Sequence, residues 1–415
     1  MKYLSGFFAQ LSLAKVMLGG IIVFFFLITL AFNFWFVGFV YNPVLDSGQE
    51  FRLLANAFLQ GRLDINKFDL LDCAMQAGKC FWALGPGPAV LMLPAVGLFK
   101  LFGQNFYQGY INFLLVAGVF LLSYLLARRI RFNTDDSLWL ALAFCFGSVF
   151  LGVAFDPRSW YYSHVVVVFF LFLALYEYFG RKRYWLVGSC LAMVAATRLN
   201  AGLGIIFFIL NIFWNSSQSY KKKFINLAQL LWPVMVGAVL LGLYNYYRFG
   251  NILDTGYTRA LVDKDFQRYW RDNFGLFNFK FILTNFYYYF LKLPEPILNQ
   301  NYSLVAPYLK VSPMGLSFFL ISPIFFRIFK TRWQNKEIIF ASIASGLVLL
   351  TVLAYFNCGF WQFGPRYMLD LLPFWFLILL YSFKNFQLTS ATKMVIGLSA
   401  FFNLYLYLNL LIFYR

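Results

Sequence analysis

Charged residues are scarce in this chain, and their scarcity excludes a soluble globular protein. Only 12% of the 415 residues are Asp, Glu, Lys or Arg, whereas 61% are hydrophobic and 22% are aromatic. A soluble core of this size would leave too few polar side chains to cover its surface. Repeated apolar runs of span length instead predict an all-α, polytopic membrane protein. The first run, 16–40, is too long and lacks a small-residue cleavage site, which indicates an anchor rather than a cleaved signal peptide.

Histidine and cysteine are also few, and this limits the metal chemistry that the chain can support. His164 is the single histidine, so a multi-histidine metal site is excluded, and the five cysteines include no CxxC pair. Cys73 and Cys80 share one predicted outer loop, where they could form a disulfide or remain two free thiols. The sequence has no phosphate-cradling glycine loop and no nucleophile elbow, which argues against an enzyme that uses ATP or nucleotide sugars.

Acidic residues are outnumbered, with 16 Asp and Glu against 34 Lys and Arg and a net charge of +18. Many of the basic residues form short clusters between apolar segments, within 128–131, 181–183, 221–223 and 327–336. Such clusters are typical of cytoplasmic loops that contact anionic lipid. We therefore expect membrane lipids, and no nucleic acid, as partners of these basic residues.

The apolar runs predict about 11 transmembrane helices, with the N-terminus inside and the C-terminus outside the cytoplasm. Their approximate ranges are 16–40, 106–127, 138–155, 164–179, 186–197, 201–214, 226–246, 313–329, 337–356, 368–383 and 394–413. Segment 84–103 is predicted to be a re-entrant or surface helix, because it holds three prolines and its crossing would place the basic loops outside. The chain, 1–415, is then a single membrane domain whose long outer regions, 41–105 and 247–312, carry juxtamembrane helices.

The short pair 186–197 and 201–214 has two interpretations, since each segment is about half of the ~20 residues that a crossing needs. The pair forms either two helices that meet near Arg198 or one long kinked segment. Two helices keep the Lys221–Lys223 cluster inside, so we favour that interpretation.

An amphipathic helix is predicted from Asp46 to Gly61, directly after the first span. Its apolar residues recur with helical spacing at Phe51, Leu54, Ala55, Phe58 and Leu59. Ser47 and Glu50 have the spacing of a capping box, and Gly61 suits the helix end. Glu50 either completes that box or binds substrate. Asp46 lies outside the box, where it either complements the helix dipole or acts as the catalytic base that deprotonates an acceptor hydroxyl.

Three polar side chains share the segment FDPRSWYYSH between two predicted spans, namely Asp156, Arg158 and His164. Asp156 and Arg158 either pair as a surface ion bridge or act as a second catalytic acid and a phosphate contact. His164 either forms a hydrogen bond at the membrane interface or binds substrate. The aromatic residues between them, Trp160, Tyr161 and Tyr162, are typical interface anchors.

Arg198, Arg248 and Arg366 each abut the outer end of a predicted span, against the usual bias of positive charge. An arginine at membrane depth is costly unless it is paired or functional, and its planar fork suits a phosphate at lipid headgroup level. Snorkelling to the interface is the alternative role for Arg248. The predicted substrate-binding set also includes Tyr257 and Tyr367.

Several longer segments resemble the integral-membrane GT-C glycosyltransferases, a superfamily that includes protein O-mannosyltransferases and lipid A aminoarabinose transferases. The segments are Asp46 with the EFRLLANAFLQGRLDI that follows it, WALGPGPAVLMLPAVGLFKLFG before a span that ends LLARRI, AATRLNAG, YNYYRFGNILDTGY and WQFGPRYMLDLLPF. The resemblance implies a polyprenyl-phosphate-linked sugar donor, an active site on the outer face and an acidic base after the first span, which Asp46 matches. Arg158, Arg248 and Arg366 match outer-face positions that could hold the lipid phosphate.

The resemblance and the residues together predict a glycosyltransferase that moves a hexose or pentose from this donor to an acceptor hydroxyl, with inversion. A glycan, a lipid or a protein carries the acceptor; no separate soluble C-terminal domain is seen, which leaves acceptor recognition to 247–312. No cofactor is required, and a divalent cation could bind through Asp46 and Asp156. The multi-pass protein is expected in a bacterial inner (plasma) membrane. The alternatives are a lipid-linked oligosaccharide polymerase or ligase and a non-enzymatic lipid or glycan transporter.

Overall fold

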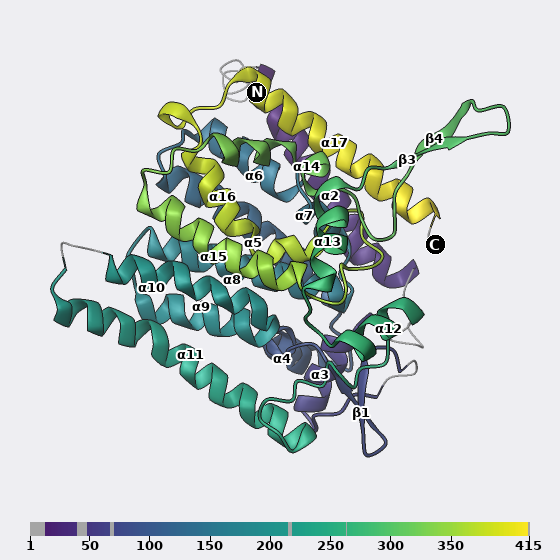
Figure 1. Cartoon of the computed structure of the whole chain (residues 1–415), viewed down its shortest axis with the longest axis vertical. Helices are drawn as coiled ribbons and strands as arrows, with labels where there is room; N and C mark the ends of the chain where they lie inside the picture. Colours follow the sequence, from purple (N-terminus) through teal and green to yellow (C-terminus); the bar gives the residue numbers. More distant parts are fainter. Residues whose placement is uncertain (1–12, 40–47, 67–69, 215–217, 263, 414–415) are drawn as a thin grey trace.

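Helices dominate the computed structural model of the chain, which describes residues 13–39, 48–66, 70–214, 218–262 and 264–413. Within that part, six helices are long and apolar enough to cross a membrane: α2 (Leu13–Phe39), α5 (Gln108–Arg129), α8 (Ser159–Tyr178), α11 (Tyr220–Phe249), α15 (Lys336–Leu353) and α17 (Ser390–Phe413). The chain is therefore an integral membrane protein, and its helices pack into one bundle (Figure 1). The count of 11 spans and the predicted orientation stay predictions.

One predicted span, 138–155, is interrupted rather than continuous. It divides into α6 (Thr134–Cys145) and α7 (Phe150–Phe155). Ser148 lies in the break, and its hydroxyl donates to the carbonyl of Phe144 at 2.5 Å. A serine that bonds back to its own helix in this way is typical of a bend or an end.

The predicted span 313–329 is also broken. It forms only the short helix α14 (Phe318–Ile321) and the 3₁₀ helix η3 (Pro323–Lys330). Pro323 has no N–H and cannot continue the hydrogen-bond ladder of α14. The remaining short elements are α12 (Asp265–Phe274), α13 (Lys280–Phe286), the π-helix η2 (Tyr287–Leu291), η4 (Arg366–Asp370), α16 (Leu372–Tyr381) and η5 (Lys384–Phe386).

The short pair forms two separate helices, as the favoured interpretation predicts. Helix α9 (Tyr184–Thr197) ends at Arg198, whose backbone is extended, with φ −144° and ψ 105°. The 3₁₀ helix η1 (Leu199–Gly204) follows and leads into α10 (Ile205–Phe213). Helix α9 packs on α8 and α11, whereas α10 packs on α15. Arg198 therefore sits at a sharp change of chain direction inside the bundle.

The amphipathic helix after the first span is shorter than predicted. Helix α3 (Glu50–Phe58) begins with Gln49 as its N-cap, and Ser47 of the predicted capping box lies outside the described residues. The predicted helix end is confirmed: Gly61 has φ 69°, and the N–H of Arg62 donates to the carbonyl of Ala57 at 2.9 Å. This bond is the six-to-one contact of a helix that ends at a left-handed glycine.

The proline-rich segment forms helix α4 (Gly87–Leu101), which is among the shorter apolar helices and not among the six long ones. The glycines before and at its start permit a close approach to α9. A Cβ at Gly85 would collide with the carbonyl oxygen of Ala196, and one at Gly87 with the hydroxyl of Thr197. Figure 1 shows α3, α4, α12 and β1 gathered at one end of the bundle, which we call the site end.

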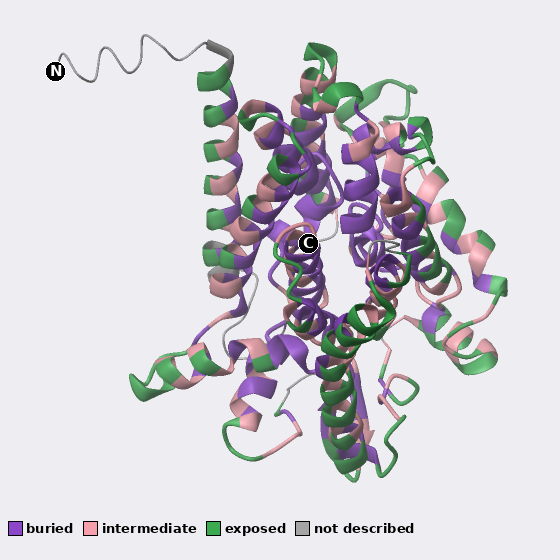
Figure 2. Ribbon diagram, turned by 90° about the vertical axis from the view of Figure 1, so that its left-hand side faces the viewer, coloured by how far each residue is buried: buried purple, intermediate pink, exposed green. Residues whose placement is uncertain are grey.

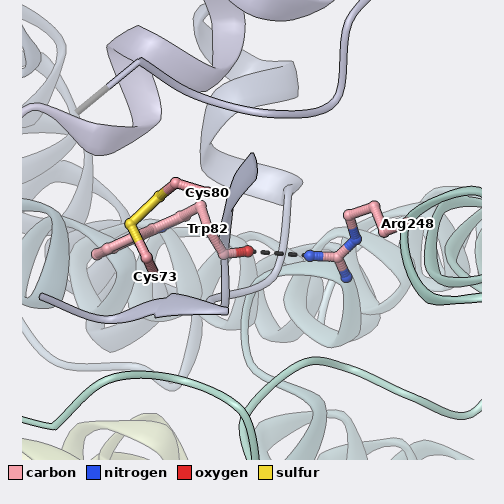
Figure 3. Close-up of a disulfide and its surroundings, with 4 residues drawn as sticks. All are labelled: Cys73, Cys80, Trp82 and Arg248. Atoms are coloured by element: carbon pink, nitrogen blue, oxygen red, sulfur yellow. Dashed lines mark hydrogen bonds between the residues drawn. A yellow bond between two sulfur atoms is a disulfide. The ribbon is translucent and has the colours of Figure 1, made fainter. Parts of the chain in front are cut away.

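Two β-hairpins complete the described part of the fold, and the sequence analysis predicts neither. Strands β1 (Cys73–Gln76) and β2 (Lys79–Trp82) pair in antiparallel register, and a disulfide joins Cys73 to Cys80. Figure 3 shows this disulfide with the guanidinium of Arg248 directed at the carbonyl of Trp82. The second hairpin consists of β3 (Glu295–Leu298) and β4 (Leu304–Lys310).

The pattern of buried and exposed residues is that of a membrane protein and not of a soluble one. Buried residues fill the middle of the molecule and exposed residues lie around it, as Figure 2 shows. The exposed side chains include many large apolar ones, and on α11 these are Trp232, Met235, Val236, Val239, Leu240 and Leu243. A helix that exposes such a face is typical of contact with lipid.

Candidate functional site

Two predicted site residues, Asp156 and Arg158, meet in the turn between α7 and α8. Asp156 ends α7 and Arg158 is the N-cap residue of α8. The Nε of Arg158 donates to both carboxylate oxygens of Asp156 at 3.0 Å, and its Nη2 donates to Oδ2 at 2.5 Å. The pair is not a surface bridge, because the Asp156 side chain is only 3% exposed. The fork geometry holds the guanidinium in one fixed orientation.

Arg366 approaches the same place from η4. Its guanidinium carbon lies 4.8 Å from the ring centre of Tyr161, while that of Arg158 lies 5.1 Å from the same ring. Tyr161 is therefore not an exposed interface anchor but a buried ring that contacts two cations. The Nη1 of Arg366 donates to the carbonyl of Phe360 at 2.7 Å, and its buried Nε has no hydrogen-bond partner among the described residues.

A left-handed residue holds these groups in place. Trp361 has φ 58°, a conformation that is costly for a large side chain. Its carbonyl accepts a hydrogen bond from the hydroxyl of Tyr161, and its ring centre lies 5.2 Å from the guanidinium carbon of Arg158. Strained backbone of this kind collects at functional sites, because the surrounding contacts must fix it.

A narrow pocket with a cavity volume of about 10 Å³, room for about one water molecule, joins these side chains. Its polar lining includes Asp156, Arg158 and Arg366. Its apolar lining includes Tyr407 and Leu410 of α17. The cations in one part of this lining and the hydrocarbon walls in another match the chemistry of an amphipathic anion, such as a lipid phosphate, and the pocket must widen to admit one.

A second buried network surrounds Asp370, at the end of η4. Arg198 donates from Nε to the two oxygens of Asp370 at 2.9 and 2.8 Å, and Asn200 donates at 2.7 Å. The Nδ1 of His164 lies 3.1 Å from Oδ1, and Asp370 and His164 are both fully buried. A carboxylate that pairs with an arginine only accepts hydrogen bonds, so the Nδ1 of His164 is the donor in this contact.

Tyr367 connects the two networks. The guanidinium carbon of Arg198 lies 4.9 Å from its ring centre and that of Arg366 lies 5.3 Å away. The ring of His164 lies 5.6 Å from the same centre. Near this ring, burial raises the pKa of Tyr257 to about 12, against the charge of Arg198. The phenol of Tyr257 is therefore a neutral hydrogen-bonding group at physiological pH.

Glu50 and Gln108 tie the start of α3 to this region. Glu50 is fully buried, and its Oε1 accepts from the N–H of Gly48 at 3.1 Å. The side-chain amide of Gln108, at the start of α5, donates to the carbonyls of Gly48 at 2.9 Å and Pro157 at 2.8 Å. Gln108 therefore links the chain just after the first span to the residue between Asp156 and Arg158.

Asp46, the predicted base, lies outside the residues that the structure describes, although Gly48 is only two positions after it. Arg248 is described, and the structure does not bring it into the pocket. Its Nη1 donates to the carbonyl of Trp82 at 3.0 Å and its Nη2 to Asn245 at 2.7 Å (Figure 3). Its guanidinium also lies 3.8 Å from the ring centre of Tyr244. These contacts explain Arg248 as a clamp between α11 and the first hairpin.

Sequence reasoning missed several residues of the site: Gln108, Tyr161, Asn200, Trp361 and Asp370. Asp370 had the clearest signal, since an acid four positions after Arg366 in an apolar context needs a partner. For a divalent cation, the described residues contain no group of three His, Cys, Asp or Glu side chains that could hold one. A cation at Asp156 would have to displace the guanidinium of Arg158.

Comparison with known proteins identifies the fold. No protein-family model and no curated protein matches the chain. The crystal structure of the oligosaccharyltransferase from Archaeoglobus fulgidus in its apo form matches with a TM-score of 0.50 and 12% identity, over 95% of this chain and 56% of that one. A second structure, the oligosaccharyltransferase AglB from Archaeoglobus fulgidus in complex with an inhibitory peptide and a dolichol-phosphate, matches with a TM-score of 0.48 and 13% identity. The match covers 95% of this chain and 55% of that one.

The chain thus spans about half the length of the solved structures it matches. At this identity the likeness shows the fold alone, which this chain shares with an oligosaccharyltransferase. The predicted resemblance to the GT-C glycosyltransferases is confirmed at the level of the fold.

Proposed function

We propose that the protein is a membrane glycosyltransferase that takes a sugar from a polyprenyl-phosphate-linked donor and transfers it to an acceptor hydroxyl outside the cytoplasm. The observation that carries the proposal is the pocket in which Arg158, Arg366 and Asp156 meet the apolar wall of α17. Such a donor is itself amphipathic, with an anionic phosphate and an isoprenoid chain. The GT-C fold, shared with an oligosaccharyltransferase, supports the same reaction class.

The arginines would stabilise the leaving group. When the bond between the anomeric carbon and the phosphate oxygen breaks, negative charge grows on the departing polyprenyl phosphate. Arg366 offers a buried Nε with no partner among the described residues, and Arg158 is fixed by Asp156. Donors that are already oriented stabilise such charge more than mobile ones do, because they need no reorganisation.

The acceptor must lose a proton as its oxygen forms the new bond to the anomeric carbon. We assign that proton to Asp46, the first carboxylate after the first span, and a single displacement then inverts the anomeric centre. Asp156 is assigned the role of orienting Arg158. We expect Asp46→Asn to abolish transfer while the protein still inserts and folds, and full activity in that variant would remove Asp46 as the base.

Binding of the lipid phosphate tests the proposal directly. Native mass spectrometry of the purified protein with undecaprenyl phosphate would compare wild type with Arg366→Ala and Arg366→Lys. We expect the Ala variant to bind about 10- to 100-fold more weakly, since hydrogen bonds to charged groups contribute roughly 1.5–3 kcal/mol, and Lys to bind between the two. The control is Arg268→Ala, whose side chain is 54% exposed on α12. Equal binding by all four proteins would overturn the phosphate role.

A lipid-linked oligosaccharide polymerase or ligase is the second candidate, and the likeness to an oligosaccharyltransferase favours it. That enzyme would use the same pocket but release a pyrophosphate-linked lipid. Mass spectrometry of lipid that co-purifies with the protein separates the candidates: a monophosphate with one sugar supports the first, and a pyrophosphate with several sugars supports the second. A protein that purifies with neither lipid, and binds neither when they are added, would contradict both.

A further inference from the structure

The hairpin of β3 and β4 stands out from the rest of the molecule beside α17, as Figure 1 shows. Its strands pair in antiparallel register from Glu295 opposite Lys310 to Leu298 opposite Leu304. Large apolar and aromatic side chains are exposed along it: Leu298, Tyr302, Leu304, Val305 and Tyr308. An isolated two-stranded hairpin is marginally stable in water, and an exposed apolar group of this kind marks an interaction surface.

The surface of α17 beside the hairpin indicates what that interaction is. One stripe of α17 is exposed, consisting of Met394, Leu398, Phe401, Leu408 and Ile412. These residues are separated by three, four or seven positions, so they form a single helical face. Because α17 is long and apolar enough to cross a membrane, we take this exposed face to be its lipid-facing side.

The hairpin is attached to that same face. Tyr405, four positions after Phe401, lies on the same face of α17, and its hydroxyl donates to the carbonyl of Pro307 in β4. The ammonium of Lys310 lies 6.0 Å from the ring centre of Phe413, at the end of α17. The hairpin therefore lies against the lipid-facing side of α17, and its exposed apolar side chains adjoin that face.

The attachment also fixes the depth of the hairpin in the membrane. Tyr405 lies eight positions before Phe413, which is about 12 Å along a helix that rises 1.5 Å per residue. The 24 residues of α17 span about 36 Å, slightly more than a hydrocarbon core of about 30 Å, so Phe413 lies near the headgroups and Tyr405 lies below them. The hairpin tip is polar, with Asn299, Gln300 and Asn301, and a Lys292–Glu295 ion pair of 2.6 Å lies at its base. The polar side chains at the tip and base and the unpaired backbone groups along the strand edges need water or headgroups as partners. The hairpin is therefore suited to the membrane interface and not to the hydrocarbon core.

We propose that the hairpin is an interfacial arm that lies on the lipid surface beside α17, with Leu298, Leu304 and Tyr308 in contact with lipid at the level of the headgroups. This inference does not depend on the proposed transfer reaction. It follows from continuity with a lipid-facing helix and from the chemistry of the exposed side chains.

An environment-sensitive fluorophore on a single introduced cysteine tests the arm. The full-length protein would be placed singly in phosphatidylcholine–phosphatidylglycerol nanodiscs, with Leu304→Cys as the test position and Asp265→Cys, on α12, as the control. The side chain of Asp265 is 99% exposed. Background labelling is low, because the free cysteines Cys145, Cys190 and Cys358 are buried. Tyr308→Cys gives an independent second position on β4.

We expect the labels at 304 and 308 to emit at shorter wavelength than the label at 265, and to be quenched about twofold or more by lipid with a shallow doxyl group. Aqueous iodide should quench the label at 265 instead. Iodide quenching at 304 and 308 without doxyl quenching would overturn the proposal and leave a surface for a protein partner. A blue-shifted label that neither iodide nor the doxyl lipid quenches would also overturn the proposal, since the label would then be packed against the protein itself.

Discussion

Asp370 is the side chain on which the buried charge near the candidate site depends. It accepts hydrogen bonds from Arg198 and Asn200 and contacts His164, and it is fully buried. Taking two charges out of water is costly, and the attraction between them repays this cost only when both are present. The network is therefore stable as a unit and vulnerable to the loss of one member.

We expect Asp370→Asn to lower the free energy of unfolding by about 3–5 kcal/mol, because it leaves the guanidinium of Arg198 buried without its counter-charge. The measurement is the apparent Tm of the purified protein in detergent. Asp265→Asn serves as the control, since its exposed side chain should matter by less than about 0.5 kcal/mol. If both variants melted with wild type, the charge of Asp370 would have no structural role.

Gln108, like Asp370, is a fully buried side chain that holds several hydrogen bonds, but it carries no charge. We expect Gln108→Glu to destabilise the protein by roughly 1–3 kcal/mol, because the carboxylate replaces an N–H₂ that donates to the carbonyls of Gly48 and Pro157. Thermal unfolding against Gln104→Glu, at an exposed position before α5, measures the difference. If Gln104→Glu were destabilised and Gln108→Glu were not, the loss of the two hydrogen bonds would have no effect on stability, and the prediction would be wrong.

The sequence predicts part of this site and misses the rest for identifiable reasons. The sequence predicts Asp156, Arg158 and Arg366 as site residues, because a charged side chain beside an apolar run is costly unless it is paired or functional. The pocket brings these three side chains together. Asp370 and Tyr161 were missed. The contact of Asp370 with His164 joins residues 206 positions apart, and nothing local encodes it. Tyr161 looked like an interface anchor, since sequence alone does not distinguish a ring facing lipid from one facing arginine.

The first hairpin is the element that joins the helices of the site end. Its strand β2 ends at Trp82, whose carbonyl accepts from Arg248 of α11, and Cys73 ties β1 to β2 through the disulfide (Figure 3). The N–H of Asp72 also donates to the carbonyl of Leu261 at 2.8 Å. The hairpin thus connects both long outer regions of the chain.

We expect Cys73→Ser together with Cys80→Ser to lower the free energy of unfolding by about 2–3 kcal/mol, the value for a loop as short as this one. The readout is the apparent Tm with and without a reductant. The reductant should lower the Tm of wild type to that of the double variant and leave the double variant unchanged. A reductant effect on the double variant would trace the shift to something other than this bond.

Elements differ in how well the sequence predicts them. Long helices such as α5 and α17 follow from uninterrupted apolar runs, and they lie close to where these runs predict them. The hairpin strands are short and do not alternate clearly, so their pairing depends on the disulfide and on contacts with other elements. The breaks in 138–155 and 313–329 depend on single residues, Ser148 and Pro323, whose effect on a long apolar run is local.

The two ends of the whole bundle differ in charge. At the end opposite the site, Arg129 donates to the carbonyl of Tyr176 at 2.6 Å, and Lys393 pairs with Asp136 at 2.7 Å. The basic clusters of the sequence lie in the loops at this end, whereas Asp156 and the pocket lie at the other. Positive charge collects on the cytoplasmic side of membrane proteins, so we expect the site end to lie outside the cytoplasm.

Cysteine labelling tests this orientation and the position of α4 together. Gln104→Cys lies just after α4 and Lys182→Cys lies between α8 and α9, and both positions are exposed. We expect a membrane-impermeant maleimide to label position 104 in intact cells and position 182 only after permeabilisation, because the basic loop stays inside. Labelling of both positions from outside would overturn the orientation. Labelling of position 104 only from the cytoplasm would show that α4 crosses the membrane, which would place the start of α5 on the wrong side for a shared outer site.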